Sequence, residues 1–196
     1  DALAVDLDHA RREKAPTVQK VISDFFGRLE LAKAQFVIKW SPSETLSELG
    51  GNILDLHFAA NTGHPLRPIE EIASGGEMSR VMLAIKAALS RALKLPALIL
   101  DEVDTGVSGE VALKVGQVMA DMASNMQLIA ITHLPQIAGK ATQHLKVYKV
   151  VDGNRTRTMM TQLLGDQRVD EIAEMISGKA INDASRESAR LLIENP

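Results

Sequence analysis

The chain has 196 residues, enough for one domain with a sizeable core. Apolar residues make up 45% of it and charged residues 24%, the balance of a soluble globular protein, and a formal net charge of −3 argues against wholesale wrapping of nucleic acid. The sequence has no cysteine, which excludes disulfides and thiolate chemistry and fits a reducing cytoplasm. No apolar run approaches the roughly 20 residues of a membrane span, so we expect a cytoplasmic protein without membrane contact.

The first thirty residues are expected to be helical. Pro16 is predicted in the first turn of a helix, where its missing N–H is not needed. The more polar segment 3–14 is predicted as a separate, weaker helix, which could end a coiled coil. We therefore expect a coiled-coil end or helical lead-in over residues 1–30 and a main domain over residues 31–196, and the sequence starts without methionine, as in a piece of a longer protein. The apolar positions with helical spacing after Pro16 are Val21, Ile22, Phe25, Phe26 and Leu29.

Two stretches of alternating polarity follow, over residues 36–40 and 53–58. Alternation is typical of half-buried strands, so we expect an antiparallel pair joined by a loop over residues 41–52. A segment punctuated by glycine and proline, residues 60–73, is predicted as a loop.

The remainder alternates helices with apolar strands. Uninterrupted apolar runs between helices are typical of a buried parallel sheet. The sequence therefore predicts an α/β fold with a largely parallel sheet flanked by helices, and with an antiparallel hairpin near the C-terminus. The predicted helices span residues 76–93, 108–124, 167–176 and 183–193, and the predicted strands span residues 97–100, 128–131, 145–151 and 158–163.

Polar residues end two neighbouring predicted strands. Asp101-Glu102 ends the first, and Thr132-His133 ends the second. In an open α/β sheet, ligands bind beyond the carboxyl ends of the strands. One carboxylate can serve magnesium while the other orients or deprotonates a water. The alternative is that these residues are only the polar end that any strand can have.

Residues Ser74-Gly75-Gly76-Glu77 begin an amphipathic helix. Ser-x-x-Glu is the pattern of a capping box. A cap does not require two glycines, each of which weakens a helix by roughly 1 kcal/mol relative to alanine. Paired glycines at the positive end of a helix also suit a phosphate, so a cap and an anion site both remain open. The polar loop 103–109 that follows the acidic pair has a simpler alternative too, a turn with Ser108 as N-cap.

Taken in order, these motifs resemble the second half of ABC-type ATPases. Ser74 to Glu77 matches the signature motif, and Ala97 to Glu102 matches the Walker B strand. Asp104 matches the D-loop aspartate, and His133 matches the switch histidine. The sequences of residues 73–80, 100–109 and 131–136 resemble those of the RecN family, whose members are relatives of the SMC proteins. Transporter-type cassettes usually have Pro-Thr after the acidic pair, where this chain has Val103-Asp104.

The resemblance implies an ATP- and Mg²⁺-dependent hydrolase acting in DNA double-strand break repair. Asp101 would hold magnesium through water, Glu102 would be the general base, and His133 would contact the γ-phosphate. Asp104 would cross the interface between two heads. Three residues would bind the γ-phosphate of the ATP held by the opposite head: Ser74, Gly75 and Gly76. Glu77, the last residue of the same motif, is expected at this nucleotide site too.

A complete head of this type also needs a Gly-x-x-x-x-Gly-Lys-Ser/Thr loop. The pairs Gly139-Lys140 and Gly178-Lys179 are each followed by alanine and do not fit it. The resemblance is therefore to the C-terminal half of a head. It implies three partners: the N-terminal half of the same head, a second head in an ATP-sandwiched homodimer, and DNA.

Two other functions compete with this one. The chain could be a structural head piece that binds a partner without turnover, or a transporter-type nucleotide-binding domain. A basic group on the predicted hairpin could touch DNA phosphates, although a solvated face explains it equally. That group is Lys146, Lys149, Arg155 and Arg157.

Overall fold

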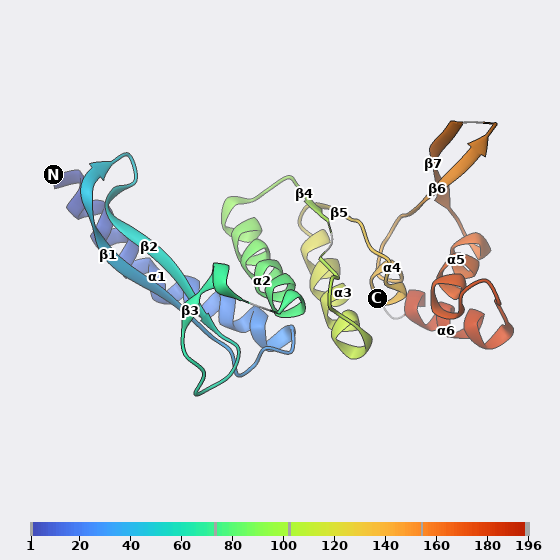
Figure 1. Cartoon of the computed structure of the whole chain (residues 1–196), viewed down its shortest axis with the longest axis horizontal. Helices are drawn as coiled ribbons and strands as arrows, with labels where there is room; N and C mark the ends of the chain where they lie inside the picture. The colour runs from blue at the N-terminus through green and yellow to red at the C-terminus, as the bar shows by residue number, and fades with distance from the viewer. Residues whose placement is uncertain (1, 73, 102, 154, 195–196) are drawn as a thin grey trace.

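The computed structural model describes residues 2–72, 74–101, 103–153 and 155–194. Figure 1 shows the elements in a row along the long axis, with α1 and the β1–β2 hairpin at one end and α5, α6 and the β6–β7 hairpin at the other. The helices are α1 (Ala2–Arg28), η1 (Ile69–Glu71), α2 (Gly75–Leu93), α3 (Gly109–Ala123), α4 (Pro135–Ala138), α5 (Asp166–Ser177) and α6 (Asp183–Glu194). The strands are β1 (Gln35–Ser47), β2 (Gly50–Ala59), β3 (Arg67–Pro68), β4 (Ala97–Leu100), β5 (Gln127–Ala130), β6 (His144–Asp152) and β7 (Arg155–Leu163).

Helix α1 is continuous through Pro16, so the predicted start of a new helix at this proline is wrong. A proline inside a helix costs about 3 kcal/mol, and contacts on the first half of α1 offset that cost. Arg11 Nη1 donates to the Leu49 carbonyl at 2.6 Å, and the Arg12 guanidinium lies 4.8 Å from the Trp40 ring centre. Both contacts reach the β1–β2 hairpin, which the sequence pattern of α1 does not reveal.

The antiparallel pairing of β1 with β2 is confirmed, but the strands are longer than predicted. The predicted loop 41–52 is mostly strand, and the pairing reaches Ser47 opposite Gly50. Its register shifts between Pro42 and Ser47. Polar residues fill this outer part because most of it is exposed, which hides the alternation that marks a strand.

The main core joins the second half of α1, the base of the β1–β2 hairpin, α2 and α3. Phe26 makes edge-to-face contacts with Phe36 and Phe58, with ring centres 6.3 Å and 5.6 Å apart. The fully buried side chains around them include Leu29, Val81, Leu83, Leu100, Val115 and Val118.

The predicted parallel pairing is confirmed for β4 and β5, which are paired from Ala97–Gln127 to Leu100–Ala130. This parallel sheet has two strands, while β1–β2–β3 and β6–β7 form antiparallel sheets. One face packs against the core of α2 and α3. The other face is open, and its isoleucines are exposed instead of buried as predicted: Ile99 (64%), Ile129 (44%) and Ile131 (58%).

The C-terminal part has a small core of its own and a projecting hairpin. Ala138, Ile172, Ala173 and Ala189 are buried together where α4, α5 and α6 meet. The predicted hairpin is confirmed as β6–β7, which extends away from α5 and α6 (Figure 1). Lys146 joins its base to α5 through Glu171 and Glu174.

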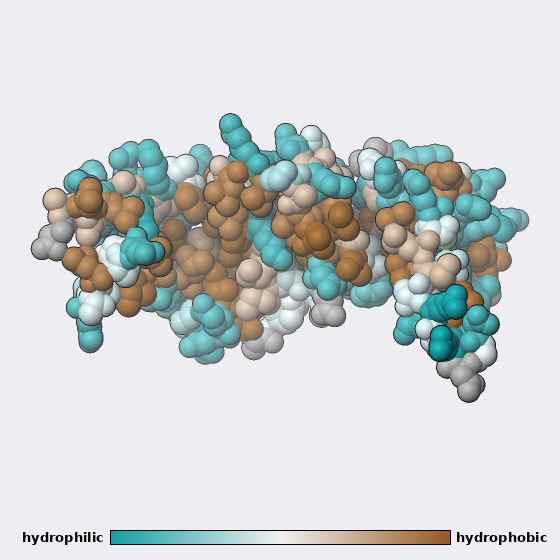
Figure 2. All heavy atoms as spheres, turned by 90° about the horizontal axis from the view of Figure 1, so that it is seen from above, coloured by the Kyte–Doolittle hydropathy of each residue, from teal (hydrophilic) through white to brown (hydrophobic). Residues whose placement is uncertain are grey.

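Hydrophobic residues occur in patches along the whole length of the face seen in Figure 2. No helix in the described ranges is both long and apolar enough to cross a membrane.

Candidate nucleotide-binding site

Asp101 lies directly after β4 and is exposed. The backbone N–H of Ile131 donates to the Leu100 carbonyl at 2.9 Å, which continues the β4–β5 pairing by one residue. Asp101 and the Thr132-His133 pair therefore leave the sheet at the same edge, as the sequence predicts. Glu102, the expected general base, lies outside the described residues.

Asp104 is the buried centre of this edge. Its side chain is 3% exposed, and its Oδ2 accepts hydrogen bonds from Thr132 Oγ1 at 2.5 Å and from the His133 backbone N–H at 3.1 Å. His133 Nδ1 lies 3.2 Å from the same oxygen, while the His133 side chain is 76% exposed. Asp104 and His133, which match the D-loop aspartate and the switch histidine, thus meet within one chain, 29 residues apart in sequence.

Ser74 caps α2, as one of the two sequence interpretations expects. Its Oγ accepts from the Glu77 backbone N–H at 3.4 Å, and its carbonyl accepts from Met78 at 2.9 Å. The first N–H groups of a helix have no partner within the helix, and among the described residues Gly75 and Gly76 gain none elsewhere. These two amides remain available to an anion.

The two glycines have different structural environments. A Cβ on Gly76 would lie 2.4 Å from the Gly106 carbonyl oxygen, and a Cβ on Gly106 would lie 2.8 Å from the Gly76 nitrogen. Gly106 also has a φ of +71°, which favours glycine. A Cβ on Gly75 would meet nothing within 4 Å. Gly76 is therefore required by backbone packing against the loop of Asp104, a contact that sequence reasoning did not anticipate.

Arg80 is a second feature that the sequence reasoning missed. Its Nε donates to the Gly76 carbonyl at 3.0 Å, and its Nη1 donates to the Leu29 carbonyl at 3.1 Å. The guanidinium thus links the first turn of α2 to the end of α1. Only its position next to the signature residues pointed to it, because its partner Leu29 is 51 residues away.

The donor set fits magnesium that is held together with a nucleotide better than magnesium held by protein alone. Among the described residues, no group of three His, Cys, Asp or Glu side chains could hold a metal ion. Mg²⁺ commonly keeps several waters and uses one or two carboxylates plus substrate phosphates. The exposed Asp101 carboxylate and the free amides of α2 are compatible with that mode.

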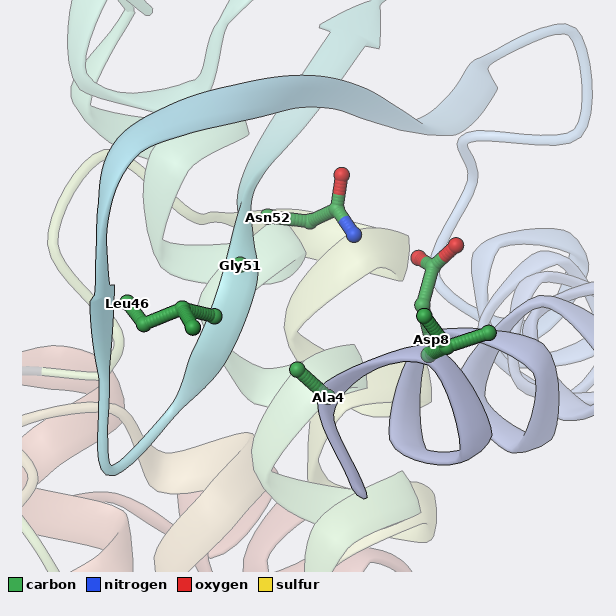
Figure 3. A pocket seen from close by; sticks show the side chains of 6 residues that line it. Ala4, Asp8, Leu46, Gly51 and Asn52 are labelled. Carbon is green, nitrogen blue, oxygen red and sulfur yellow. The ribbon is translucent and has the colours of Figure 1, made fainter. Parts of the chain in front are cut away.

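Two hollows in the surface lie away from these residues. One, of about 290 Å³, lies between the start of α1 and the tip of the β1–β2 hairpin, where Ala4 and Asp8 face Leu46, Gly51 and Asn52 (Figure 3). The other, of about 430 Å³, is lined by Arg91, Lys94 and Met122 at the ends of α2 and α3, among other residues. Neither hollow has a residue of the four motifs among the described residues that line it.

No protein-family model matches the chain. Curated proteins do match, and three of them named DNA repair protein RecN come from Rickettsia bellii, Vibrio cholerae and Deinococcus radiodurans. They are 39%, 36% and 38% identical over 99%, 98% and 95% of this chain. The matched part is 35%, 35% and 33% of their own lengths. The chain is homologous to part of RecN.

The fold agrees with this relationship. An SMC ATPase chain, solved in work on ATP-driven dimerization and DNA-stimulated activation, matches with a TM-score of 0.58 at 18% identity, over 88% of this chain and 98% of that chain. The Smc head domain of Pyrococcus yayanosii matches with a TM-score of 0.66 at 21% identity, over 84% of this chain and 30% of that chain. The α/β head fold is confirmed, and a transporter-type domain is not favoured.

The RecN relationship also decides how far function can be read from homology. The chain spans about a third of the length of the curated relatives it matches. The activity of the whole proteins therefore does not follow for this chain from homology alone.

Proposed function

We propose that this chain is the C-terminal half of a RecN-type ATPase head, which hydrolyses ATP once it joins an N-terminal half that carries the phosphate-binding loop. The observation that carries the proposal is the meeting of three motifs within one chain. Asp104 contacts His133, and Gly106, two residues further on, packs against Gly76 of the signature motif. Residues separated by about 30 positions converge on one edge of the sheet, beside Asp101.

The open face of the parallel pair supports a missing partner half. Ile99 and Ile129 are exposed side by side on the paired strands, and the exposed Ile131 follows directly after β5. Parallel sheets are normally covered on both faces, so this face is suited to burial against further structure. The β6–β7 hairpin supports the same conclusion, because a two-stranded hairpin alone is marginal in water and this one exposes Val147, Val151 and Met160.

Within the joined head, each described residue has a role that fits its position. The exposed Asp101 carboxylate would hold the magnesium ion through water, and the ion would supply charge neutralisation to the phosphates. His133, whose side chain is exposed, would contact the γ-phosphate. The amides of Gly75 and Gly76, with Ser74, would bind the nucleotide of the opposite head, and Glu77 would support this turn by its capping hydrogen bond.

Glu102 would act as general base on the attacking water, and this role gives the test. Glu102→Gln keeps the size of the side chain but removes the base, so ATP should bind and persist in engaged head dimers. We expect turnover in the joined head to fall by about 100-fold or more, with dimers accumulating in size-exclusion chromatography with ATP.

Glu48→Gln is the matched control, because Glu48 is an exposed carboxylate in the turn between β1 and β2, at the end of the molecule away from the motifs (Figure 1). It should leave turnover and dimer content unchanged. Undiminished turnover in Glu102→Gln would contradict the assignment of the base.

We further propose that the chain acts on DNA as part of the longer protein, and that residues 1–30 continue into a coiled coil.

A further inference from the structure

The Asp104 carboxylate is buried among groups of its own chain, with 3% of its side chain exposed. Its Oδ2 accepts hydrogen bonds from Thr132 Oγ1 and from the His133 backbone N–H, and His133 Nδ1 lies 3.2 Å from the same oxygen. A polar side chain this deeply buried needs hydrogen-bond partners of this kind to offset its loss of water.

The loop around Asp104 is itself held in place. The Val107 backbone N–H donates to the Asp104 carbonyl at 3.1 Å, and Gly106 packs against Gly76. On the other side, Thr132 Oγ1 accepts from the Leu134 backbone N–H at 3.0 Å. The carboxylate is thus a fixed group against which an otherwise exposed imidazole can be aligned.

We propose that Asp104 is a positioning residue for His133: its Oδ2 keeps the ring proton on Nδ1 and leaves Nε2 as the nitrogen that faces the nucleotide. The tautomer of a histidine is set by the partner of one ring nitrogen, and a carboxylate near Nδ1 selects the Nδ1–H form. The His133 side chain is 76% exposed, and among the described residues Asp104 is the polar partner of its ring, so we expect Asp104 to restrict the rotation of the ring. What Nε2 then contacts rests on the proposed function, whereas the tautomer does not.

The tautomer can be measured directly on this chain. Long-range ¹H–¹⁵N correlation spectra at pH 8 distinguish protonated from unprotonated ring nitrogens, and the signals of His133 are identified by their loss in His133→Gln. We expect Nδ1 to be the protonated nitrogen in the wild-type chain. In Asp104→Ala we expect a shift to the Nε2–H form or to a mixture. Thr132→Val removes a different donor from the same carboxylate and should leave the Nδ1–H form in place.

An Nε2–H form in the wild-type chain would overturn the proposal, and so would an unchanged tautomer in folded Asp104→Ala. The wild-type spectrum keeps the test decisive even if the variant fails to fold. ATP turnover in the joined head separates the two levels of the argument. If the tautomer changes as expected while turnover in Asp104→Ala stays at the wild-type rate, positioning stands and the proposed role of His133 in hydrolysis fails.

Discussion

At the scale of single residues, the two adjacent glycines of the signature motif make opposite predictions. Gly76→Ala places a Cβ against the Gly106 backbone, so overpacking should lower the free energy of unfolding by about 1–3 kcal/mol. Gly75→Ala has open space and should be neutral or stabilising by up to about 1 kcal/mol. Urea unfolding followed by circular dichroism measures both. Equal effects would show that the contact of Gly76 with Gly106 is not formed.

His144 gives a pH-dependent prediction at the same scale. Burial, and then the nearby Arg168 charge, lower the pKa of His144 below its ordinary value of 6.5. The unfolded chain therefore binds a proton more readily than the folded one as the pH falls below about 6.5. The stability contributed by neutral His144 is present above that pH and is lost as the pH falls toward the folded pKa.

We expect His144→Gln to lose less stability than the wild-type chain between pH 7.5 and pH 5.5, measured as the change in urea midpoint. His64→Gln is the control, since His64 lies in an exposed turn. An identical acid-induced loss in the wild-type chain and in His144→Gln would contradict the assignment.

At the scale of elements, Arg168 joins α5 to the end of α4. Its Nη2 donates to the carbonyls of Gly139 at 2.9 Å and Ala141 at 2.5 Å. Arg168→Ala should leave the part-buried Gly139 carbonyl without a charged donor and should cost about 2 kcal/mol. Amide hydrogen exchange should become faster in α5 and α6 to a greater extent than in α1. Arg190→Ala, which breaks an exposed pair with Glu187, should have little effect.

Periodicity predicted most elements, and its failures have physical causes. Helices α2 and α3 and strands β4 and β5 were predicted within a residue or two, because each carries a clear apolar pattern. The predicted helix boundary at Pro16 was wrong because contacts that stabilise the first half of α1 come from the β1–β2 hairpin, which is distant in sequence. The open face of the parallel pair could not be predicted, since an apolar strand has the same sequence pattern whether or not other structure covers its second face.

The candidate site was predictable as a set of residues but not as an arrangement. Motif order predicted that Asp101 and His133 share an edge of the sheet. It did not predict that Asp104 would be buried beside His133, or that Gly76 serves packing with Gly106. Those contacts join segments about 30 residues apart, and single-sequence patterns carry no information on such pairs.

At the scale of the whole molecule, the open face of β4 and β5 predicts where the N-terminal half joins. Ile129→Lys should leave the stability of this chain within about 0.5 kcal/mol, because the side chain is partly exposed and is not in the core. It should weaken co-purification with the preceding segment of a RecN relative, since the lysine charge would be buried there. Leu93→Lys, at an exposed position on α2, is the control. Unimpaired association of Ile129→Lys would place the interface elsewhere.

The central claim is that this chain supplies half of an ATPase site. The most direct measurement is ATP hydrolysis by the chain alone and by the chain mixed with the N-terminal segment, each with and without DNA. We predict turnover only in the mixture, abolished by Glu102→Gln in this chain. Robust hydrolysis by the chain alone would contradict the account, because it would require a phosphate-binding loop within these 196 residues.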